Sequence, residues 1–406
     1  MSISLENDNL YKQLLCFKER SVSRAVTADH VLFDECISAF RPNGEQRFRL
    51  RDGPSYSYLL TNFELSKDWQ LPNCTVHRSV RVHLPGAYSA FICRVDNPES
   101  CDSHNSHLYG IALSSIVTFS SGRLCKSTRD DYLCRRESLT EHDAVELSLF
   151  YPVLTAGPGC VHTSLTAITL QKYEDELRHL ISQLHVVPYS TYVVLMQAIR
   201  LVHLSLLAKR DDFGMAYLLI VSAIESVAQH AIKRDKVRKV HPNEDAWSSR
   251  AQHDQEFSQL LKAYREARGQ NQYLKERYVE FINTFAPASD WEKVVSHPLQ
   301  DLADYVRDIS PTHGMDHVVE KHWFEKYPAD LSNKEIGTIL SDSYTHRSCF
   351  IHRGEQPPHR EPTSFNRFFQ EFLDYDGTAI IKQLLPNYEL LFGIAQCSIR
   401  NWMDSI

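Results

Sequence analysis

Two residues that could act on a phosphodiester lie close together in segment 332–354, whose sequence is SNKEIGTILSDSYTHRSCFIHRG. The guanidinium of Arg347 can bind phosphate oxygens in a fork, and the imidazole of His352 can move protons near neutral pH. A helix over this segment would place the two side chains about 140° apart, so that they flank a groove. The spacing predicts chemistry on a phosphodiester bond. The alternative interpretation of the spacing alone is a solvated helix end.

The surrounding sequence predicts that segment 332–354 forms one capped helix. Ser332 followed three residues later by Glu335 is a capping box, which marks a helix N-terminus. Apolar residues then recur at helical spacing, at Ile336, Ile339, Leu340, Phe350 and Ile351. Gly354 ends the helix, so His352 lies in the last turn, where the helix dipole favours a charged imidazole.

A second helix is expected over 213–232, FGMAYLLIVSAIESVAQHAI. Asp211 and Asp212 offer an N-cap, and the segment is apolar almost all round. Glu225 is its only ionised residue, and a buried carboxylate is costly unless it is paired. Glu225 is therefore either a site residue or a glutamate at a subunit seam or an end of the core.

Positive charge is concentrated in segment 233–239, KRDKVRK, although the formal net charge of the chain is -7. With that overall charge, contact with a polynucleotide has to come from a local basic patch. The candidate residues for such a contact are Lys233, Arg234, Lys236, Arg238, Lys239 and, on the helix of Arg347, Arg353. The plainer interpretation is a solvated helix terminus whose basic side chains complement the helix dipole.

The order of features in 332–354 resembles the motif helix of HEPN domains, in particular those of the ApeA-like branch. That order is a capped helix, a tyrosine, Arg347-Ser348, an apolar pair, His352 and a glycine. HEPN families of this branch often carry an acidic residue on the long helix before the motif helix, and Glu225 stands at the matching position. The resemblance covers the second half of the chain, including a closing helix at 388–403. It implies that Arg347, His352 and Glu225 are the catalytic set, with Glu225 orienting Arg347.

HEPN proteins of this kind are typically metal-independent endoribonucleases of bacterial anti-phage, abortive-infection or toxin systems, and they act as dimers. The resemblance implies RNA cleavage in which the 2′-hydroxyl attacks the adjacent phosphorus and leaves a 2′,3′-cyclic phosphate and a 5′-hydroxyl. His352 would act as base or acid, and Arg347 would stabilise charge on the phosphoryl oxygens. The implied partners are RNA, a second copy of the chain bound through the helical half, and a phage-derived or nucleic-acid trigger, with no cofactor and no metal.

The alternative from a different class is a non-catalytic HEPN-type dimerisation module whose N-terminal domain binds a ligand or a protein. Many HEPN domains have lost activity by losing the arginine or the histidine. This chain keeps both, as Arg347 and His352, which favours the enzyme.

Two histidine-containing clusters have the spacing of metal ligands. They are Cys101, His104 and His107, with Cys93, Cys125, Cys134 or Cys160 as a fourth ligand, and His313, His317 and His322. The sequence has no Cys-x2-Cys pair, which structural zinc sites usually contain, so a polar loop is the plainer explanation for both. Cys349 could be a thiol nucleophile, but on a helix it would face away from His352.

The expected compartment is the cytoplasm. The ten cysteines indicate free thiols in a reducing environment, and the start MSISLENDNLYKQ has no apolar core of a signal peptide. The longest apolar candidate for a membrane span, Tyr189–Ala208, carries Gln197, Arg200 and His203 on one stripe. It is therefore expected to be an amphipathic helix buried in protein, and the chain to be soluble.

The chain of 406 residues is too long for one ordinary core, so two domains of an α+β protein are expected. Residues 1–170 should form a β-rich sensor or recognition domain (a sandwich or half-open barrel), 171–188 a connecting helix, and 189–406 an all-α HEPN-like domain. Strands are expected at 46–51, 56–63, 75–83, 90–96, 108–120, 145–154 and 161–170. Helices are expected within 1–40 and at 189–208, 211–234, 255–268, 272–285, 290–307, 315–326, 332–352, 364–373 and 388–403, with 235–254 a mobile polar loop.

Overall fold

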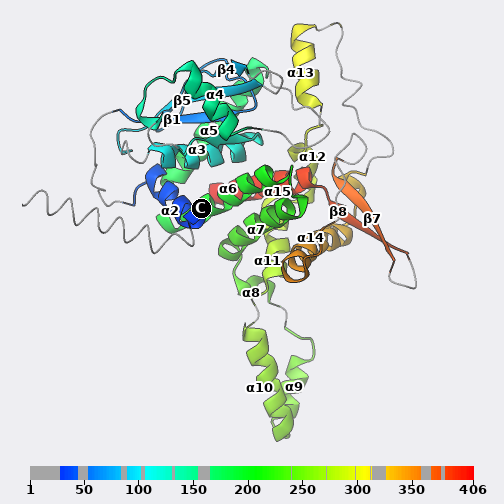
Figure 1. Cartoon of the computed structure of the whole chain (residues 1–406). Coiled ribbons are helices and arrows are strands. Elements are labelled where there is room, and N and C mark those ends of the chain that lie inside the picture. Colours follow the sequence, from blue (N-terminus) through cyan, green and yellow to red (C-terminus); the bar gives the residue numbers. More distant parts are fainter. Residues whose placement is uncertain are drawn as a thin grey trace, which may run out of the picture. The chain divides into compact units, whose positions relative to one another are not determined.

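The computed structural model divides the chain into two compact units, Met1–Leu154 with Leu170–His185 and Thr155–Thr169 with Val186–Ile406 (Figure 1). The structure describes residues 28–43, 54–83, 89–101, 106–129, 133–153, 165–238, 240–270, 272–297, 299–310, 312, 326–357, 367–375 and 380–406. A six-stranded sheet lies in the first unit, and the second unit is mostly helical. The predicted α+β fold class is therefore confirmed.

The sheet of the first unit is antiparallel at every pairing. Its strands are, in sheet order, β2 (Trp69–Gln70), β3 (Thr75–Val76), β5 (Ser89–Asp96), β1 (Tyr56–Thr61) and β6 (Cys125–Ser127), with β4 (Val80–His83) also paired to β5. Every residue of β1 after the first is buried, so both faces of the sheet are covered at its centre. The strands predicted at 56–63 and 90–96 are thus present in the structure, whereas the single strand predicted at 75–83 is divided into β3 and β4.

Helix α3 (Ser106–Ser121) lies directly on one face of this sheet. A Cβ atom at Gly110 would clash with the side chains of Ser57 on β1 and Ser127 on β6, so the close approach of helix and strands requires glycine. The other helices of the unit are α2 (Ala28–Phe40), which packs on α3, η3 (Leu133–Arg135), α4 (Glu141–Phe150), which packs on β4, and α5 (Ala167–Val186).

Three segments predicted as strands are helical where the structure describes them: 108–120, 145–154 and the end of 161–170, where α5 begins at Ala167. Segment 108–120 lies within α3, which is buried almost all round and therefore shows no helical period by which to recognise it. Segment 145–154 overlaps α4, whose capping box of Thr140 and Asp143 lies upstream of the apolar run. The described strands of the first unit form one sheet, so the sandwich, which needs two packed sheets, is not present among them. The predicted strand at 46–51 and residues 161–164 lie outside the described residues.

Helix α7 (Phe213–Ala231) is central to the second unit (Figure 1). It packs against α6 (Tyr189–Ala208), α11 (Leu274–Phe285), α14 (Asn333–Arg353) and α15 (Tyr388–Asp404). These neighbours explain why its sequence is apolar almost all round. The other elements described in this unit are α8 (Arg234–Val237), α9 (Glu244–Ala251), α10 (Gln255–Gln270), η4 (Ala288–Asp290), α12 (Trp291–Val294), α13 (Gln300–Ile309), η7 (Pro328–Asp330), β7 (Phe369–Tyr375) and β8 (Ile380–Pro386).

The second unit differs from the prediction at three places, and the first of them departs from an all-α domain. The segment predicted as helix 364–373 contains the start of β7, which pairs with β8 in an antiparallel hairpin. The helix predicted at 290–307 is divided into two helices, α12 and α13, in the structure. Segment 235–254 is not a loop, since it contains most of α8 and all of α9, which packs on α10. The helix predicted at 315–326 lies outside the described residues except for its last residue.

Helices α6 and α7 are long and apolar enough to cross a membrane by length and composition alone. In the structure they pack against each other, and both also contact α15. His203 on α6 and Glu225 on α7 are buried among these helices. The two helices therefore pack within the helical unit, as expected for 189–208.

Two glycines of α14 should respond in opposite ways to alanine. Gly354 has a left-handed φ of 69° at the C-cap, whereas Gly337 lies inside the helix with nothing within 4 Å of an added Cβ. Gly354→Ala should lower the free energy of unfolding by about 1 kcal/mol, and Gly337→Ala should raise it by about 0.5–1 kcal/mol. Urea unfolding of the two variants measures this. The same sign of change in both would contradict the assigned end of the helix.

Candidate functional site

Helix α14 begins and ends where the sequence predicts. The Ser332 hydroxyl accepts a hydrogen bond from the backbone N–H of Glu335, and the Glu335 carboxylate accepts one from the Ser332 N–H at 2.8 Å. The Ser332 hydroxyl also donates to this carboxylate, at 2.6 Å. This hydrogen bond, followed by the one from the Ser332 N–H, holds the pKa of Glu335 below its usual range. At the other end, the N–H of Gly354 donates to the Phe350 carbonyl at 3.0 Å. Both ends of the helix are therefore capped, and the residues between them have a defined backbone.

Helix α7, which packs against α14, is capped as well. Asp212, one of the two predicted N-cap residues, accepts a hydrogen bond from the N–H of Met215 at 2.9 Å. At the far end, buried Arg277 of α11 donates through Nε to the carbonyl of Ile232 at 2.8 Å. Glu225 lies between these ends with only 4% of its surface exposed. As the sequence predicts, the carboxylate is buried and needs a partner.

That partner is Arg347 of α14. Its Nη2 atom lies 2.7 Å from Glu225 Oε2, and the two side chains are 19% and 6% exposed. Nε of Arg347 donates to the Ser222 hydroxyl at 3.4 Å. Both contacts use the Nε and Nη2 edge of the guanidinium, and Nη1 makes no hydrogen bond or ion pair with the described residues.

The second oxygen of Glu225 is held by two donors. Oε1 accepts from the hydroxyl of Tyr344 at 3.2 Å and from Nε2 of Gln229 at 3.3 Å. The ring of Tyr344 also lies against the guanidinium of Arg347, with 5.6 Å from its centroid to Cζ. Burial, followed by the charge of Glu225, raises the pKa of Tyr344 to about 12. Tyr344 is therefore a neutral hydrogen-bond donor at physiological pH.

The sequence interpretation missed the supporting residues Tyr344, Gln229 and Ser222. A signal was present in the spacing, because residues three or four apart share one face of a helix. Ser222 and Gln229 have this spacing from Glu225, and Tyr344 has it from Arg347. Only the packing of α7 against α14 shows that the two faces meet.

His352 lies apart from this cluster. Its side chain is exposed in the last turn of α14. Among the described residues, no hydrogen bond or ion pair joins it to Arg347 or Glu225. Since Arg347 faces α7, ideal helix geometry directs His352 about 140° away from that helix. The structure thus brings Arg347 and Glu225 together and places His352 on the exposed side of α14.

The predicted RNA-binding residues fall into two groups at opposite ends of α7. Lys233, Arg234, Lys236 and Arg238 are exposed on and beside α8, directly after α7, and Lys239 lies outside the described residues. Arg353 lies in the last turn of α14, near the start of α7, because a Cβ at Gly214 would meet Phe350 and Gln356. The 19 residues of α7 separate the groups by about 28 Å.

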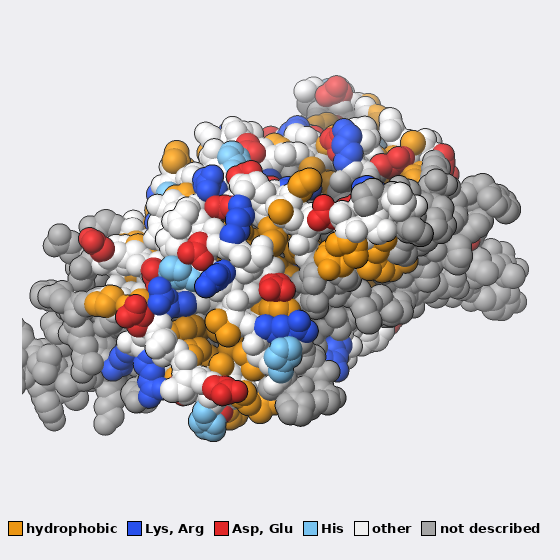
Figure 2. Space-filling model, turned by 90° about the horizontal axis from the view of Figure 1, so that it is seen from above, with side chains coloured by type: hydrophobic (Ala, Val, Ile, Leu, Met, Phe, Trp, Pro, Cys, Tyr) orange, Lys and Arg blue, Asp and Glu red, His pale blue; other side chains and the backbone are white. Residues whose placement is uncertain are grey.

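Several of these cations already have partners. Lys236 forms an ion pair with Glu280 at 2.8 Å, and Arg234 donates to the carbonyl of Gly269 at 3.3 Å. Arg353 Nη2 donates to Cys349 Sγ at 2.7 Å and lies 3.3 Å from Glu355. On the face seen in Figure 2, basic and acidic side chains are interspersed. That face therefore mixes both signs of charge.

The metal-ligand clusters are not supported by the part of the chain that the structure describes. There, no group of three or more His, Cys, Asp or Glu side chains is arranged to hold a metal ion. Burial raises the pKa of the Cys93 thiol to about 12 and also raises that of Cys125, which disfavours the thiolate that zinc needs. Cys101, Cys134 and His107 are described, whereas His104, Cys160, His313, His317 and His322 lie outside the described residues.

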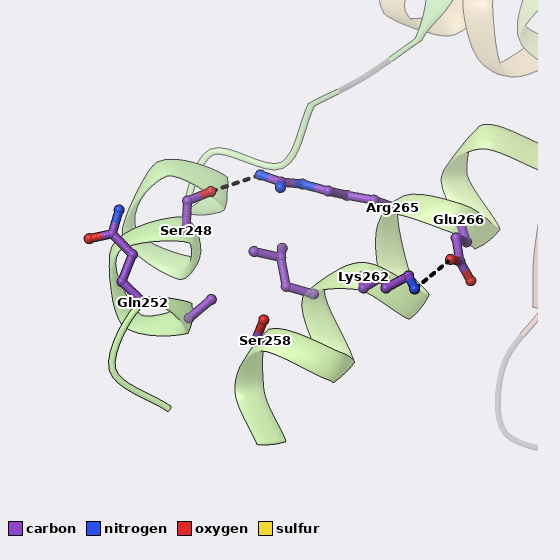
Figure 3. A pocket seen from close by; sticks show the side chains of 8 residues that line it. Ser248, Gln252, Ser258, Lys262, Arg265 and Glu266 are labelled. Atoms are coloured by element: carbon purple, nitrogen blue, oxygen red, sulfur yellow. Dashed lines mark hydrogen bonds and ion pairs between the residues drawn. The ribbon is translucent and has the colours of Figure 1, made fainter. Parts of the chain in front are cut away.

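An open pocket of about 610 Å³ lies between α9 and α10 (Figure 3). It is lined by Ser248, Ala251, Gln252, Ser258, Leu261, Lys262, Arg265 and Glu266. Arg265 donates to the Ser248 hydroxyl at 2.8 Å and to Glu244 at 3.0 Å, so these polar groups fasten α9 to α10. The lining includes none of the predicted site residues.

Comparison with known proteins does not assign the chain to a family. No family model, no curated protein and no solved structure matches it. The resemblance to HEPN domains therefore rests on the residues of α14 and α7 themselves.

Proposed function

We propose that the protein is a metal-independent endoribonuclease of the HEPN type. The observation that carries this proposal is the buried ion pair between Glu225 and Arg347, on the helix that also presents His352. A guanidinium whose Nε and Nη2 edge is held by protein has its remaining edge fixed in direction. An exposed imidazole in the same helix can reach a bound phosphodiester from its other side.

The proposed reaction is a transesterification within the RNA chain. The 2′-oxygen bonds to phosphorus and loses its proton, the bond from phosphorus to the 5′-oxygen breaks, and that oxygen takes up a proton. The products are a 2′,3′-cyclic phosphate and a 5′-hydroxyl. His352 carries out one of the two proton transfers, and Arg347 stabilises the charge that develops on the phosphoryl oxygens.

The reaction needs two proton transfers, and the single histidine of each motif carries out only one of them. The other transfer requires another group. A second copy of the chain would supply it, so we propose a dimer or higher oligomer formed through the helical unit. The N-terminal unit would act as a sensor of a phage-derived or nucleic-acid trigger and hold no catalytic residue. In this proposal the protein acts in the bacterial cytoplasm as an anti-phage or toxin effector.

The decisive test is RNA cleavage in the absence of free metal. The purified full chain, incubated with total bacterial RNA in EDTA, should yield fragments ending in 2′,3′-cyclic phosphate and 5′-hydroxyl. An oligonucleotide with 2′-deoxyribose at the cut position should resist cleavage, because the attacking oxygen is missing. Arg347→Ala, purified in the same way, controls for contaminating nucleases.

Two results would contradict the proposal. Cleavage of the deoxy substrate, or fragments ending in a 3′-hydroxyl, would exclude the transesterification. Equal cleavage by the wild type and by Arg347→Ala would favour the alternative, a non-catalytic dimerisation module whose N-terminal unit binds a ligand or protein.

A further inference from the structure

Tyr344 contacts both members of the buried ion pair. Its hydroxyl donates to Glu225 Oε1, and its ring lies against the guanidinium of Arg347, one helical turn further along α14. Only 8% of Tyr344 is exposed, and its ring packs 5.5 Å from that of Tyr278 on α11. Three helices therefore fix the position of this side chain.

We propose that Tyr344 is a positioning residue that holds Arg347 in one orientation for phosphate binding. It acts in two ways: its hydroxyl stops the Glu225 carboxylate from rotating, and its ring limits the positions open to the guanidinium. The inference rests on the proposed function, because Arg347 is the phosphate-binding group of that site. Tyr344 itself is too deeply buried to touch RNA.

The physical argument is one of preorganisation. Arginine has several rotatable bonds, and a partly exposed arginine held by a single ion pair retains much of that freedom. In this protein, the carboxylate that holds Arg347 is itself held by donors from α14 and α7, Tyr344 and Gln229. The raised pKa of Tyr344 keeps its hydroxyl protonated, so the donor persists over the whole range in which an RNase would work. Losing it should affect the rate of cleavage more than RNA affinity.

The matched test replaces two neighbouring tyrosines with phenylalanine. Tyr344→Phe keeps the ring and removes the hydrogen bond to Glu225. Tyr278→Phe is the control, because Tyr278 is also buried and its hydroxyl forms a hydrogen bond with the Ser343 hydroxyl at 3.1 Å and none with Glu225. With an RNA oligonucleotide, Tyr344→Phe should lower kcat about tenfold at nearly unchanged KM, the loss expected for one hydrogen bond to a charged group. Tyr278→Phe should lower thermal stability and leave kcat within about twofold.

Combining Tyr344→Phe with Arg347→Ala separates positioning from a general effect on the fold. If Tyr344 acts through Arg347, its substitution should change the residual single-turnover rate of the Arg347→Ala protein less than twofold. A tenfold loss in both backgrounds, or an equal loss in Tyr278→Phe, would overturn the inference while leaving the proposed function intact. If wild type and Arg347→Ala cleave RNA equally, the proposed function fails and this inference fails with it.

Discussion

Replacing His352 with alanine is expected to lower RNA cleavage by about 10²–10⁴-fold, the usual contribution of a general acid or base. RNA affinity should hardly change, because the imidazole moves a proton in the transition state and adds little to ground-state binding. The side chain is exposed in the last turn of α14, so the free energy of unfolding should also stay the same. A lower cleavage rate with unchanged stability and RNA affinity would therefore assign His352 to the chemical step. Single-turnover cleavage, RNA binding and urea unfolding measure the three quantities.

The chain offers a matched control in His346, on the same helix. Its Nε2 lies 3.3 Å from Oε1 of Gln383 on β8, so this histidine serves to join α14 to the hairpin. His346→Ala should cleave RNA at nearly the wild-type rate.

Mixing His352→Ala with Arg347→Ala should restore part of the activity if each site is built from residues of two chains. If His352→Ala alone cleaves RNA at the wild-type rate, His352 has no part in the reaction and this end of α14 is only a solvated helix end.

The helix that carries the motif could be predicted because its signals are local. The capping box of Ser332 and Glu335 and the glycine at 354 act within one turn of chain, and both are present in the structure. The burial of Glu225 followed from the apolar sequence around it. In each case, neighbouring residues alone determine the feature, so one sequence is enough.

The failures occur where tertiary packing decides the structure. The residues of α3 are buried almost all round, and an apolar run without a period fits a strand or a helix equally well. The start of β7 has aromatic residues at a spacing that a helix would also allow, and only its pairing with β8 decides between them. The predicted loop 235–254 contains α9, whose Glu244 is buried by contacts with Arg265 and Arg268 of α10.

In the site, too, the local features could be predicted and the contacts between distant residues could not. Arg347 and Glu225 could each be singled out, and the HEPN resemblance implied that they meet. The hydroxyl of Tyr344 reaches Glu225 across 119 residues of sequence, and no local signal predicts such a contact. Contacts of this kind depend on how α7 crosses α14, which follows from the packing of the whole helical unit.

Replacing Arg347 with alanine should affect both cleavage and folding, unlike the change at His352. Cleavage should fall by about 10²–10³-fold, because the charge on the phosphoryl oxygens loses its main donor. RNA affinity should fall as well, since a guanidinium binds phosphate in the ground state too. Arg347→Lys should restore little of the rate, because an ammonium group cannot contact Glu225 and phosphate along two edges of one plane.

The effect on folding follows from the partner that remains. Without Arg347, the carboxylate of Glu225, whose side chain is 6% exposed in the intact protein, keeps only the neutral donors Tyr344 and Gln229 among the described residues. The free energy of unfolding should therefore fall by on the order of 2–3 kcal/mol, somewhat less than for a fully buried pair because Arg347 is partly exposed. Adding Glu225→Gln to Arg347→Ala removes the unpaired charge, so the double variant should recover most of the stability and none of the activity.

If the double variant is no more stable than Arg347→Ala, the ion pair does not hold the two helices as the structure shows. If Arg347→Ala cleaves RNA at the wild-type rate, the guanidinium has no part in the reaction.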